Sequence, residues 1–405
     1  MIDILRATYE RLINQTNTET YRYLYPLFNL DSRLTGLVGP RGVGKTTLLL
    51  QYIKNHLYKD KKTFYFSADN IYFNTTSLLD FVNRMFLEEG IEVFFIDEIH
   101  KYKLGDWSQE LKNIYDSYPS IKIIFSGSSS LDLVHGAYDL SRRAKMFKLN
   151  GLSFREYLNF KTQSKIESVS FESLMKNHHQ YDGQWSQIPK LMGHFKDYLR
   201  YGYYPFLFED TLSYYEKISQ IIEKTIFEDI SQYYSLKTNY LYHLKKILNF
   251  LASIPPGQIS IHNLAKNLKI DDKTTFNYLK LLEETGLTRS VFTIASGNQL
   301  LRKPEKIFLN NTTLLSAINN YLGISIEYGN LRELFFIQSL ENAGVKIFYS
   351  TVGDFCTEKH IFEIGGKNKK QHQVKLVKEN AFIVKDDILV SSANQIPLYY
   401  FGFLY

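Results

Sequence analysis

Short apolar runs alternate with longer segments of helical spacing along the N-terminal part of the chain. Most residues are apolar in Leu34 to Val38, Val93 to Ile96, Ile121 to Phe125 and Met146 to Leu149, and runs of this length predict buried strands. After the first run, Lys45 to His56 carries apolar residues at the spacing of an amphipathic helix. The pattern therefore predicts an α/β fold.

The next part of the chain favours helices. Ser153 and Glu156 have the Ser-x-x-Glu spacing of a capping box, which predicts a helix that begins near Phe154 and closes the first domain. Residues 160–190 are polar with weak periodicity and predict loops with one short helix. From residue 211 to 230, isoleucines recur at helical spacing and predict a structural helix.

Two features of this helical part suggest a chemical role, and each has a simpler interpretation. His178 and His179 are adjacent and have no cysteine or carboxylate spaced to complete a metal site, so we interpret both as surface residues. Five tyrosine and phenylalanine side chains between Tyr201 and Phe208 would suit stacking on bases. The glycine and proline among them favour a packed junction between a helix and a turn instead.

The segment from Leu241 to Val291 has the pattern of a winged helix-turn-helix. A first helix stops at Pro255, Ser260 can cap a second, and a third helix ends at Gly286 before the first strand of the wing. The residues expected to face inward from the third helix are Phe276, Leu279 and Leu282.

Charge permits nucleic-acid binding without arguing for it. The net charge is +6 and the pI is near 8.9, and between Lys359 and Lys385 seven lysines stand against two glutamates. The third helix of the winged segment offers Lys273 and Lys280, but Glu283 and Glu284 offset their charge. DNA contact and protein packing are therefore equally open for this helix.

Composition places the chain among intracellular globular proteins. Its 405 residues predict roughly two to four domains. The single cysteine, Cys356, has no internal partner for a disulfide and indicates a reducing cytoplasm. The N-terminus lacks the apolar core of a secretory signal, and no segment approaches the roughly 20 apolar residues that span a bilayer. We expect a cytoplasmic protein without a membrane partner.

The most specific motif begins where the first apolar run ends. Gly39 to Thr46 reads "GPRGVGKT" and fits GxxxxGK[ST] without a mismatch, between a predicted strand and a predicted helix. This order directs backbone N–H groups and a helix N-terminus at an anion. We expect Lys45 to reach the β- and γ-phosphates of a nucleotide and the Thr46 hydroxyl to ligate Mg²⁺. The expected nucleotide-binding residues are Gly39, Pro40, Arg41, Gly42, Val43, Gly44, Lys45, Thr46 and Thr47.

Acidic and hydroxyl side chains follow two other predicted strands. Asp97 and Glu98 come directly after the run "VFFI", where Asp97 would hold Mg²⁺ and Glu98 would act as general base toward water. The next strand ends in "SGSSS", so Ser126 and Ser128 are candidates for a polar sensor of the γ-phosphate, although such turns also arise for local reasons.

Arg142 and Arg143 precede the run from Met146 to Leu149. Either arginine could stabilise transition-state charge in its own subunit or in a neighbouring one, and both could equally be solvated.

The motifs together resemble the AAA+ superfamily, and more closely its prokaryotic ATPases with a winged helix and a nuclease-like C-terminal domain. The resemblance rests on the P-loop, "FFIDE", "FSGSSS", the paired arginines and "LNGLSFREYL", and it extends over nearly the whole chain. It implies a parallel sheet of order 5-1-4-3-2, ATP and Mg²⁺ as ligands, Ser126 as the first sensor, and Arg142 or Arg143 as an arginine finger.

The tail, residues 325–405, has the pattern of a second α/β unit, with "LYYFGFLY" as its last strand. In outline it is similar to the PD-(D/E)xK nucleases, a restriction-endonuclease-like fold in which acidic residues and a lysine bind a metal and orient water. The matching residues are Glu333, Asp354, Glu363 and Lys367. The lysine expected two positions after Glu363 is absent, and the nearest is Lys367. Lys367 could still reach round the turn at Gly365 and Gly366, but loss of nuclease chemistry with retention of the fold is the simpler interpretation.

The expected domains are an AAA+ P-loop ATPase core at 1–158, a helical lid or linker at 159–240, a winged helix-turn-helix at 241–310 and a nuclease-like α/β domain at 311–405. One hypothesis is an ATPase that controls a DNA-acting tail through the winged helix and the basic terminal part. A second is a nucleotide-dependent switch, homo-oligomeric or bound to a protein partner, without DNA activity. A metabolic kinase is disfavoured because no acceptor-substrate lid follows the core.

Overall fold

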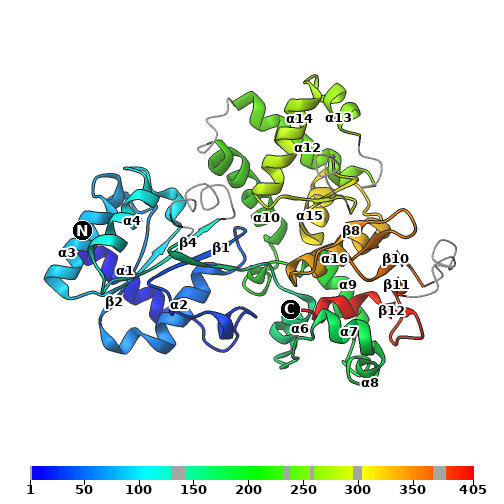
Figure 1. Cartoon of the computed structure of the whole chain (residues 1–405), viewed down its shortest axis with the longest axis horizontal. Coiled ribbons are helices and arrows are strands. Elements are labelled where there is room, and N and C mark those ends of the chain that lie inside the picture. The colour runs from blue at the N-terminus through cyan, green and yellow to red at the C-terminus, as the bar shows by residue number, and fades with distance from the viewer. Residues whose placement is uncertain are drawn as a thin grey trace. The chain divides into compact units, whose positions relative to one another are not determined.

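The computed structural model describes residues 2–128, 140, 142–231, 238–255, 260–294, 303–367 and 380–405. The chain divides into two compact units, Met1–Asn150 and Gly151–Tyr405 (Figure 1). The boundary falls before the capped helix α6 (Phe154–Thr162), which belongs to the second unit. None of the helices in the described part has the length and apolar character needed to cross a bilayer.

The first unit is built on a five-stranded sheet whose neighbouring strands all run parallel. Its order, β2-β3-β4-β1-β5, confirms the order 5-1-4-3-2 that the resemblance implied. The strands are β1 (Leu34–Gly39), β2 (Thr63–Ser67), β3 (Val93–Asp97), β4 (Lys122–Ser128) and β5 (Ala144–Lys148). Figure 1 shows helices packed around this sheet: α1 (Ile2–Gln15), α2 (Lys45–His56), α3 (Leu78–Glu89) and α4 (Trp107–Ser117).

The central strands of this sheet carry side chains that are buried on both faces. Phe94, Phe95 and Ile96 of β3 and Leu34 and Leu37 of β1 have no exposed surface. Strands covered on both faces read as continuous apolar runs, which is why the sequence pattern located them. The carboxyl ends of β1, β3 and β4 therefore form one rigid edge on which polar residues are placed.

The second unit begins with helices α6, α7 (Phe171–Asn177), α8 (Asp182–Trp185), α9 (Leu191–Tyr201) and α10 (Tyr214–Lys224), and a π-helical segment (Thr225–Ile230) continues α10. The capping box of α6 is present, with both Ser153 and Glu156 bonded to backbone amides. Tyr203 and Tyr204 are buried, which confirms the packed junction.

The interpretation of His178 as a surface residue is wrong. Its ring is buried, 4.2 Å from the ring of His179 and 6.1 Å from that of Phe382, as measured between centroids. The segment that we expected to be mostly loop contains α7 and α8, and the turn between them directs His178 inward.

Helices and a strand pair occupy the next part: α12 (Thr238–Ser253), α13 (Ile261–Leu268), α14 (Asp272–Glu284), and β6 (Thr288–Val291) antiparallel to β7 (Lys306–Leu309). Ser260 caps α13 as expected, since its side chain accepts the Asn263 amide. The inward orientation predicted for Phe276 is wrong, because this ring is 37% exposed. The buried stripe of α14 is instead formed by Thr275, Tyr278, Leu279 and Leu282, at spacings of three and four residues.

A second sheet closes the chain, in the order β12-β11-β10-β9-β8. Its strands are β8 (Phe348–Tyr349), β9 (Phe355–Cys356), β10 (Ile361–Gly365), β11 (Ala381–Lys385) and β12 (Gln395–Pro397), preceded by α15 (Thr312–Leu322) and α16 (Tyr328–Asn342). β8, β9 and β10 are joined antiparallel, whereas β10, β11 and β12 are joined parallel.

The strand predicted for "LYYFGFLY" is wrong, because Leu398–Phe403 forms a 3₁₀-helix. All six residues of this helix are buried. A continuous apolar run carries no period that separates a strand from a buried helix, so the pattern could not decide.

Candidate functional site

The phosphate-binding loop of the motif connects β1 to α2. Gly42 and Gly44 have φ angles of 78° and 93°, a left-handed conformation that glycine adopts without steric cost. At Gly39 a Cβ atom would lie 2.1 Å from the carbonyl oxygen of Leu149, so no larger residue fits. Val43 points inward and is fully buried. The loop is therefore fixed by backbone geometry and presents its amides at the N-terminus of α2.

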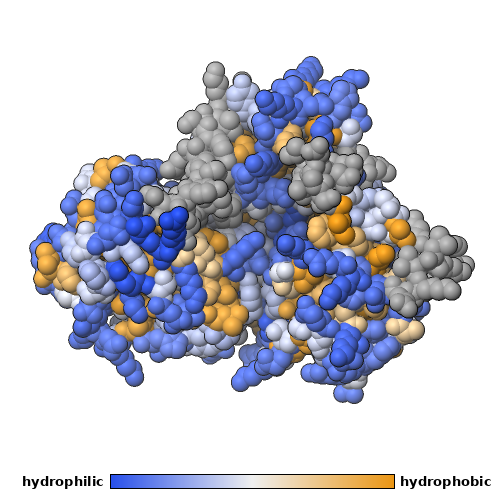
Figure 2. All heavy atoms as spheres, viewed as in Figure 1, coloured by the Kyte–Doolittle hydropathy of each residue, from blue (hydrophilic) through white to orange (hydrophobic). Residues whose placement is uncertain are grey.

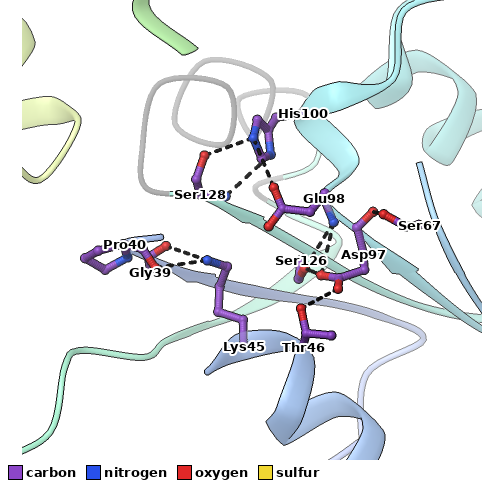
Figure 3. Close-up of polar contacts among 10 residues, drawn as sticks. All are labelled: Gly39, Pro40, Lys45, Thr46, Ser67, Asp97, Glu98, His100, Ser126 and Ser128. Atoms are coloured by element: carbon purple, nitrogen blue, oxygen red, sulfur yellow. Dashed lines mark hydrogen bonds and ion pairs between the residues drawn. The ribbon is translucent and has the colours of Figure 1, made fainter. Parts of the chain in front are cut away.

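Lys45 begins α2 and turns its amine back onto this loop (Figure 3). The Nζ atom donates to the carbonyl oxygens of Gly39, at 2.9 Å, and Pro40, at 3.1 Å. The side chain is buried, so its positive charge acts in a region of low dielectric constant. An amine held here beside loop amides forms a site suited to phosphate oxygens.

The carboxylate of Asp97, at the end of β3, accepts hydrogen bonds from hydroxyl groups on three elements. Thr46 Oγ1 of α2 donates to Oδ2 over 2.5 Å, and the Tyr65 hydroxyl of β2 donates to the same oxygen over 2.8 Å. Ser126 of β4 donates to Oδ1. Burial raises the pKa of Tyr65, and the Asp97 charge raises it further, so Tyr65 remains a donor.

The oxygens of Thr46 and Asp97 are the kind of ligand that Mg²⁺ prefers, and they lie beside the phosphate-binding loop. The donor set therefore fits a magnesium ion.

Glu98 follows in a left-handed conformation, with φ 51° and ψ 42°. Such a conformation is uncommon for a residue with a side chain and costs on the order of 1 kcal/mol or more. The Glu98 amide donates to Asp97 Oδ1 at 3.1 Å and to Ser126 Oγ at 3.3 Å, which compensates for this cost. The turn directs the Glu98 carboxylate away from Asp97 and toward His100 (Figure 3).

His100 was not predicted from the sequence. Its ring is buried, and its Nε2 atom lies 3.4 Å from Glu98 Oε2 and 3.0 Å from Ser128 Oγ. The Ser128 amide donates to Nδ1 at 3.4 Å. The only signal in the sequence is a histidine two positions after Glu98, which is too weak to identify a function.

Arg22 is a second residue that the sequence analysis missed. Its buried guanidinium donates to the carbonyl oxygen of Val43, in the phosphate-binding loop, and to that of Asn150, the latter at 2.7 Å. It therefore ties the loop to the chain segment that leaves β5. No motif surrounds Arg22, so only the fold reveals this contact.

The expected sensor and finger residues occupy different places. Ser126 contacts Asp97 and the Glu98 amide, within the site. Arg143 lies against Asp116 and Tyr115 of α4, and Arg142 is exposed.

The strand register shows which edge of the sheet holds the arginines. Ala144, the first residue of β5, pairs with Leu34, the first residue of β1. Arg143 is therefore at the edge of the sheet opposite the phosphate-binding loop, roughly 15 Å away by strand length. A role in the site of a neighbouring copy stays a prediction.

The residues matched to the nuclease motif make different contacts in the second unit. Glu333 Oε2 pairs with Lys306 Nζ at 2.8 Å, and Asp354 Oδ2 accepts the Ile364 amide at 2.6 Å. Glu363 is buried in β10, and Lys367 is exposed beyond its end. Across the described ranges, no three histidine, cysteine, aspartate or glutamate side chains are grouped to hold a metal ion. Most lysines of the basic segment lie outside the described residues.

Two segments of the chain match known families. Residues 31–158 match the family described as an AAA domain, and residues 192–325 match a domain of unknown function. The first match agrees with the strand order and the P-loop, so this part of the chain has the fold of an AAA-family P-loop NTPase core.

The whole chain is similar to uncharacterized protein MJ1637 of Methanocaldococcus jannaschii, with 29% identity over 97% of this chain and 91% of that protein. Among solved structures, a variant of Thermotoga maritima RuvB aligns over 80% of this chain and 95% of its own, with 14% identity and a TM-score of 0.28. Aquifex aeolicus DnaA bound to AMPPCP aligns over 68% and 86%, with 13% identity and a TM-score of 0.25. At these TM-scores neither structure bears on the function.

Proposed function

We propose that the N-terminal unit binds ATP and hydrolyses it in a Mg²⁺-dependent reaction. The observation that carries this proposal is the 2.5 Å hydrogen bond from Thr46 Oγ1 to Asp97 Oδ2. It brings the end of the phosphate-binding loop to the acidic end of β3, so the two halves of a hydrolytic site share one edge of the sheet. The family match of residues 31–158 supports the same conclusion.

The proposed roles follow from the geometry. Lys45 would leave the carbonyl oxygens of Gly39 and Pro40 and turn to phosphate oxygens, which offer it a full negative charge. Thr46 and Asp97 would hold Mg²⁺, which when bound neutralises charge that develops on the phosphates. Glu98 would accept a proton from the attacking water or orient it. Ser126 would keep Asp97 and the Glu98 backbone in register.

Steady-state ATP turnover of the full chain tests this assignment. Glu98→Gln keeps the size of the side chain but removes the carboxylate, so we expect turnover to fall by at least about 100-fold while ATP still binds. Lys45→Ala should lose ATP binding as well. Full turnover by the Glu98→Gln protein would contradict the role assigned to Glu98.

We further propose that nucleotide state is coupled to DNA binding by the second unit, through a winged helix formed by α12, α13, α14, β6 and β7. Figure 2 shows that the visible face over α13 and α14 is largely hydrophilic. Glu283 accepts hydrogen bonds from the Ser290 amide and hydroxyl, so its carboxylate is directed at Ser290, whereas Lys273 and Lys280 are exposed. Glu284 does lie 3.7 Å from Lys280.

ATP turnover and light scattering, measured with and without duplex DNA, separate DNA coupling from the alternative. Stimulation by DNA that weakens on Lys273→Ala would support coupling. Oligomerisation that depends on nucleotide and ignores DNA would favour the protein-interaction switch instead. The mixed sheet of β8 to β12 supports the proposal that a nuclease-like fold is retained. Cleavage of DNA in Mg²⁺ that is lost on Glu363→Ala would show retained chemistry.

A further inference from the structure

We propose that His100 is a positioning residue that fixes the Glu98 carboxylate and ties it to Ser128 at the end of β4. This inference rests on the proposed hydrolysis, in which Glu98 handles the attacking water. It assigns a task to a buried side chain that the AAA motifs leave unassigned, and it follows from three contacts of one imidazole ring.

The first contact determines which ring nitrogen carries the proton. The Ser128 backbone amide donates to His100 Nδ1 at 3.4 Å. A backbone amide can only donate, so Nδ1 must offer a lone pair. A neutral ring then carries its proton on Nε2, because the bond at one nitrogen sets the tautomer of the other.

The other two contacts lie at Nε2, which is hydrogen-bonded to Ser128 Oγ and within ion-pair distance of Glu98 Oε2. Nε2 lies 3.4 Å from Glu98 Oε2 and 3.0 Å from Ser128 Oγ, and the His100 side chain is only 2% exposed. A carboxylate is an acceptor and Nε2–H is a donor, so the pair is attractive in a region where water competes little. Of the conformations open to the Glu98 side chain, the ring therefore favours the one that places Oε2 beside Nε2.

The position of Ser128 adds a link to the phosphate-binding loop. Ser128 pairs with Gly39 in the parallel register of β1 and β4. Gly39 is also the residue whose carbonyl oxygen accepts the Lys45 amine. One continuous path of backbone and imidazole contacts thus runs from the loop to the Glu98 carboxylate, without passing through Asp97.

A matched pair of substitutions tests the role of the Nε2–H group. Leucine and glutamine both approximate the volume of histidine, but only glutamine can place an N–H donor near the position of Nε2. We expect His100→Leu to lower kcat by about 10- to 100-fold, as for other residues that orient a reacting group, and His100→Gln to stay within about 3-fold of wild type. The Kd for a fluorescent ATP analogue should change by less than about 2-fold in both, because His100 acts on Glu98 and not on nucleotide binding.

Ser128→Ala is a second variant, and it keeps the amide that bonds Nδ1. Because Glu98 then becomes the remaining acceptor at Nε2 among these three residues, the His100 ring should keep its Nε2–H tautomer in this variant, as read by ¹⁵N NMR. Thermal melting of each variant shows whether it is folded. Equal kcat for the His100→Leu and wild-type proteins would overturn the proposal, and so would an equal loss in the leucine and glutamine variants.

A measurement without turnover separates this inference from the proposed function. The ring nitrogens of His100, assigned in ¹⁵N NMR by their loss in His100→Gln, should report the Nε2–H tautomer in the nucleotide-free protein. A proton on Nδ1 would overturn the proposal even if ATP is hydrolysed. A wild-type protein that hydrolyses no ATP but has the Nε2–H tautomer would refute the proposed function and leave the His100 geometry supported.

Discussion

Thr46 Oγ1 donates to Asp97 Oδ2 over 2.5 Å, although 51 residues separate the two in the sequence. The contact joins the first turn of α2 to the end of β3, and Tyr65 donates to the same carboxylate oxygen from β2. Together with Ser126 of β4, donors from three elements therefore converge on one buried acid. These hydrogen bonds hold in place Thr46 and Asp97, the two side chains that would contribute oxygen ligands to Mg²⁺.

We predict that Thr46→Ala and Asp97→Asn each reduce ATP turnover by at least about 100-fold and raise the Mg²⁺ concentration required for half-maximal turnover. Since both side chains act on one ion, ATP turnover of the double variant should be only slightly below that of the less active single variant. Turnover measured across a series of MgCl₂ concentrations checks this. The exposed Thr75→Ala serves as the control, and a normal Mg²⁺ requirement in Thr46→Ala would contradict the assignment.

Gly39→Ala should disrupt the phosphate-binding loop. The added Cβ would meet the Leu149 carbonyl oxygen at 2.1 Å, and a backbone atom cannot move aside as a flexible side chain can. We expect a destabilisation of about 1–3 kcal/mol, seen as a lower melting temperature, and loss of binding to a fluorescent ATP analogue.

Gly193→Ala is the matched control for this substitution. Gly193 lies within α9, and its Cβ would meet nothing within 4 Å. Alanine should stabilise this helix by about 0.5–1 kcal/mol and leave nucleotide binding unchanged. Equal melting temperatures for the two variants would show that the space around Gly39 is not limiting.

The sequence predicted those parts of the site whose residues lie close together along the chain. The loop from Gly39 to Thr46 and the acidic pair at Asp97 and Glu98 each lie within a few residues of an apolar run, so pattern and motif reinforce each other. The strand order was correct because the motifs occur in the same succession as in the family that they resemble.

The remaining parts depend on contacts between distant segments. Tyr65 reaches Asp97, and His100 reaches Ser128, only because β2, β3 and β4 pair in a particular register, which no local pattern encodes. The orientation of Phe276 was wrong for a related reason. Two stripes on α14 contain apolar residues, and packing selects the one through Tyr278 and Leu282.

Arg22→Ala should weaken nucleotide binding although Arg22 lies outside every motif. Its guanidinium donates hydrogen bonds to two carbonyl oxygens, those of Val43 and Asn150. Without these hydrogen bonds the phosphate-binding loop is held less rigidly. We expect the Kd for a fluorescent ATP analogue to rise by about 10-fold, equivalent to one charge-assisted hydrogen bond.

Arg22→Lys should recover only part of this affinity. A lysine retains the charge but has a single donor group in place of the planar fork that spans both oxygens. Titration of the analogue into the three proteins gives the comparison, with melting curves to confirm folding. Wild-type affinity in the alanine variant would exclude a role for Arg22 in the loop.

The stability of the second unit should fall as the pH is lowered below neutral, with His178 contributing. Burial, and then the neighbouring His179, hold the pKa of His178 below its ordinary value of 6.5. The unfolded chain therefore binds this proton more readily than the folded chain, so stability is fully present above pH 6.5 and is lost as the pH falls toward the lowered pKa. His178→Gln should show a smaller drop in melting temperature between pH 7 and pH 5.5 than wild type. The exposed His262→Gln is the control, and an identical drop in His178→Gln and wild type would show that His178 does not couple folding to pH.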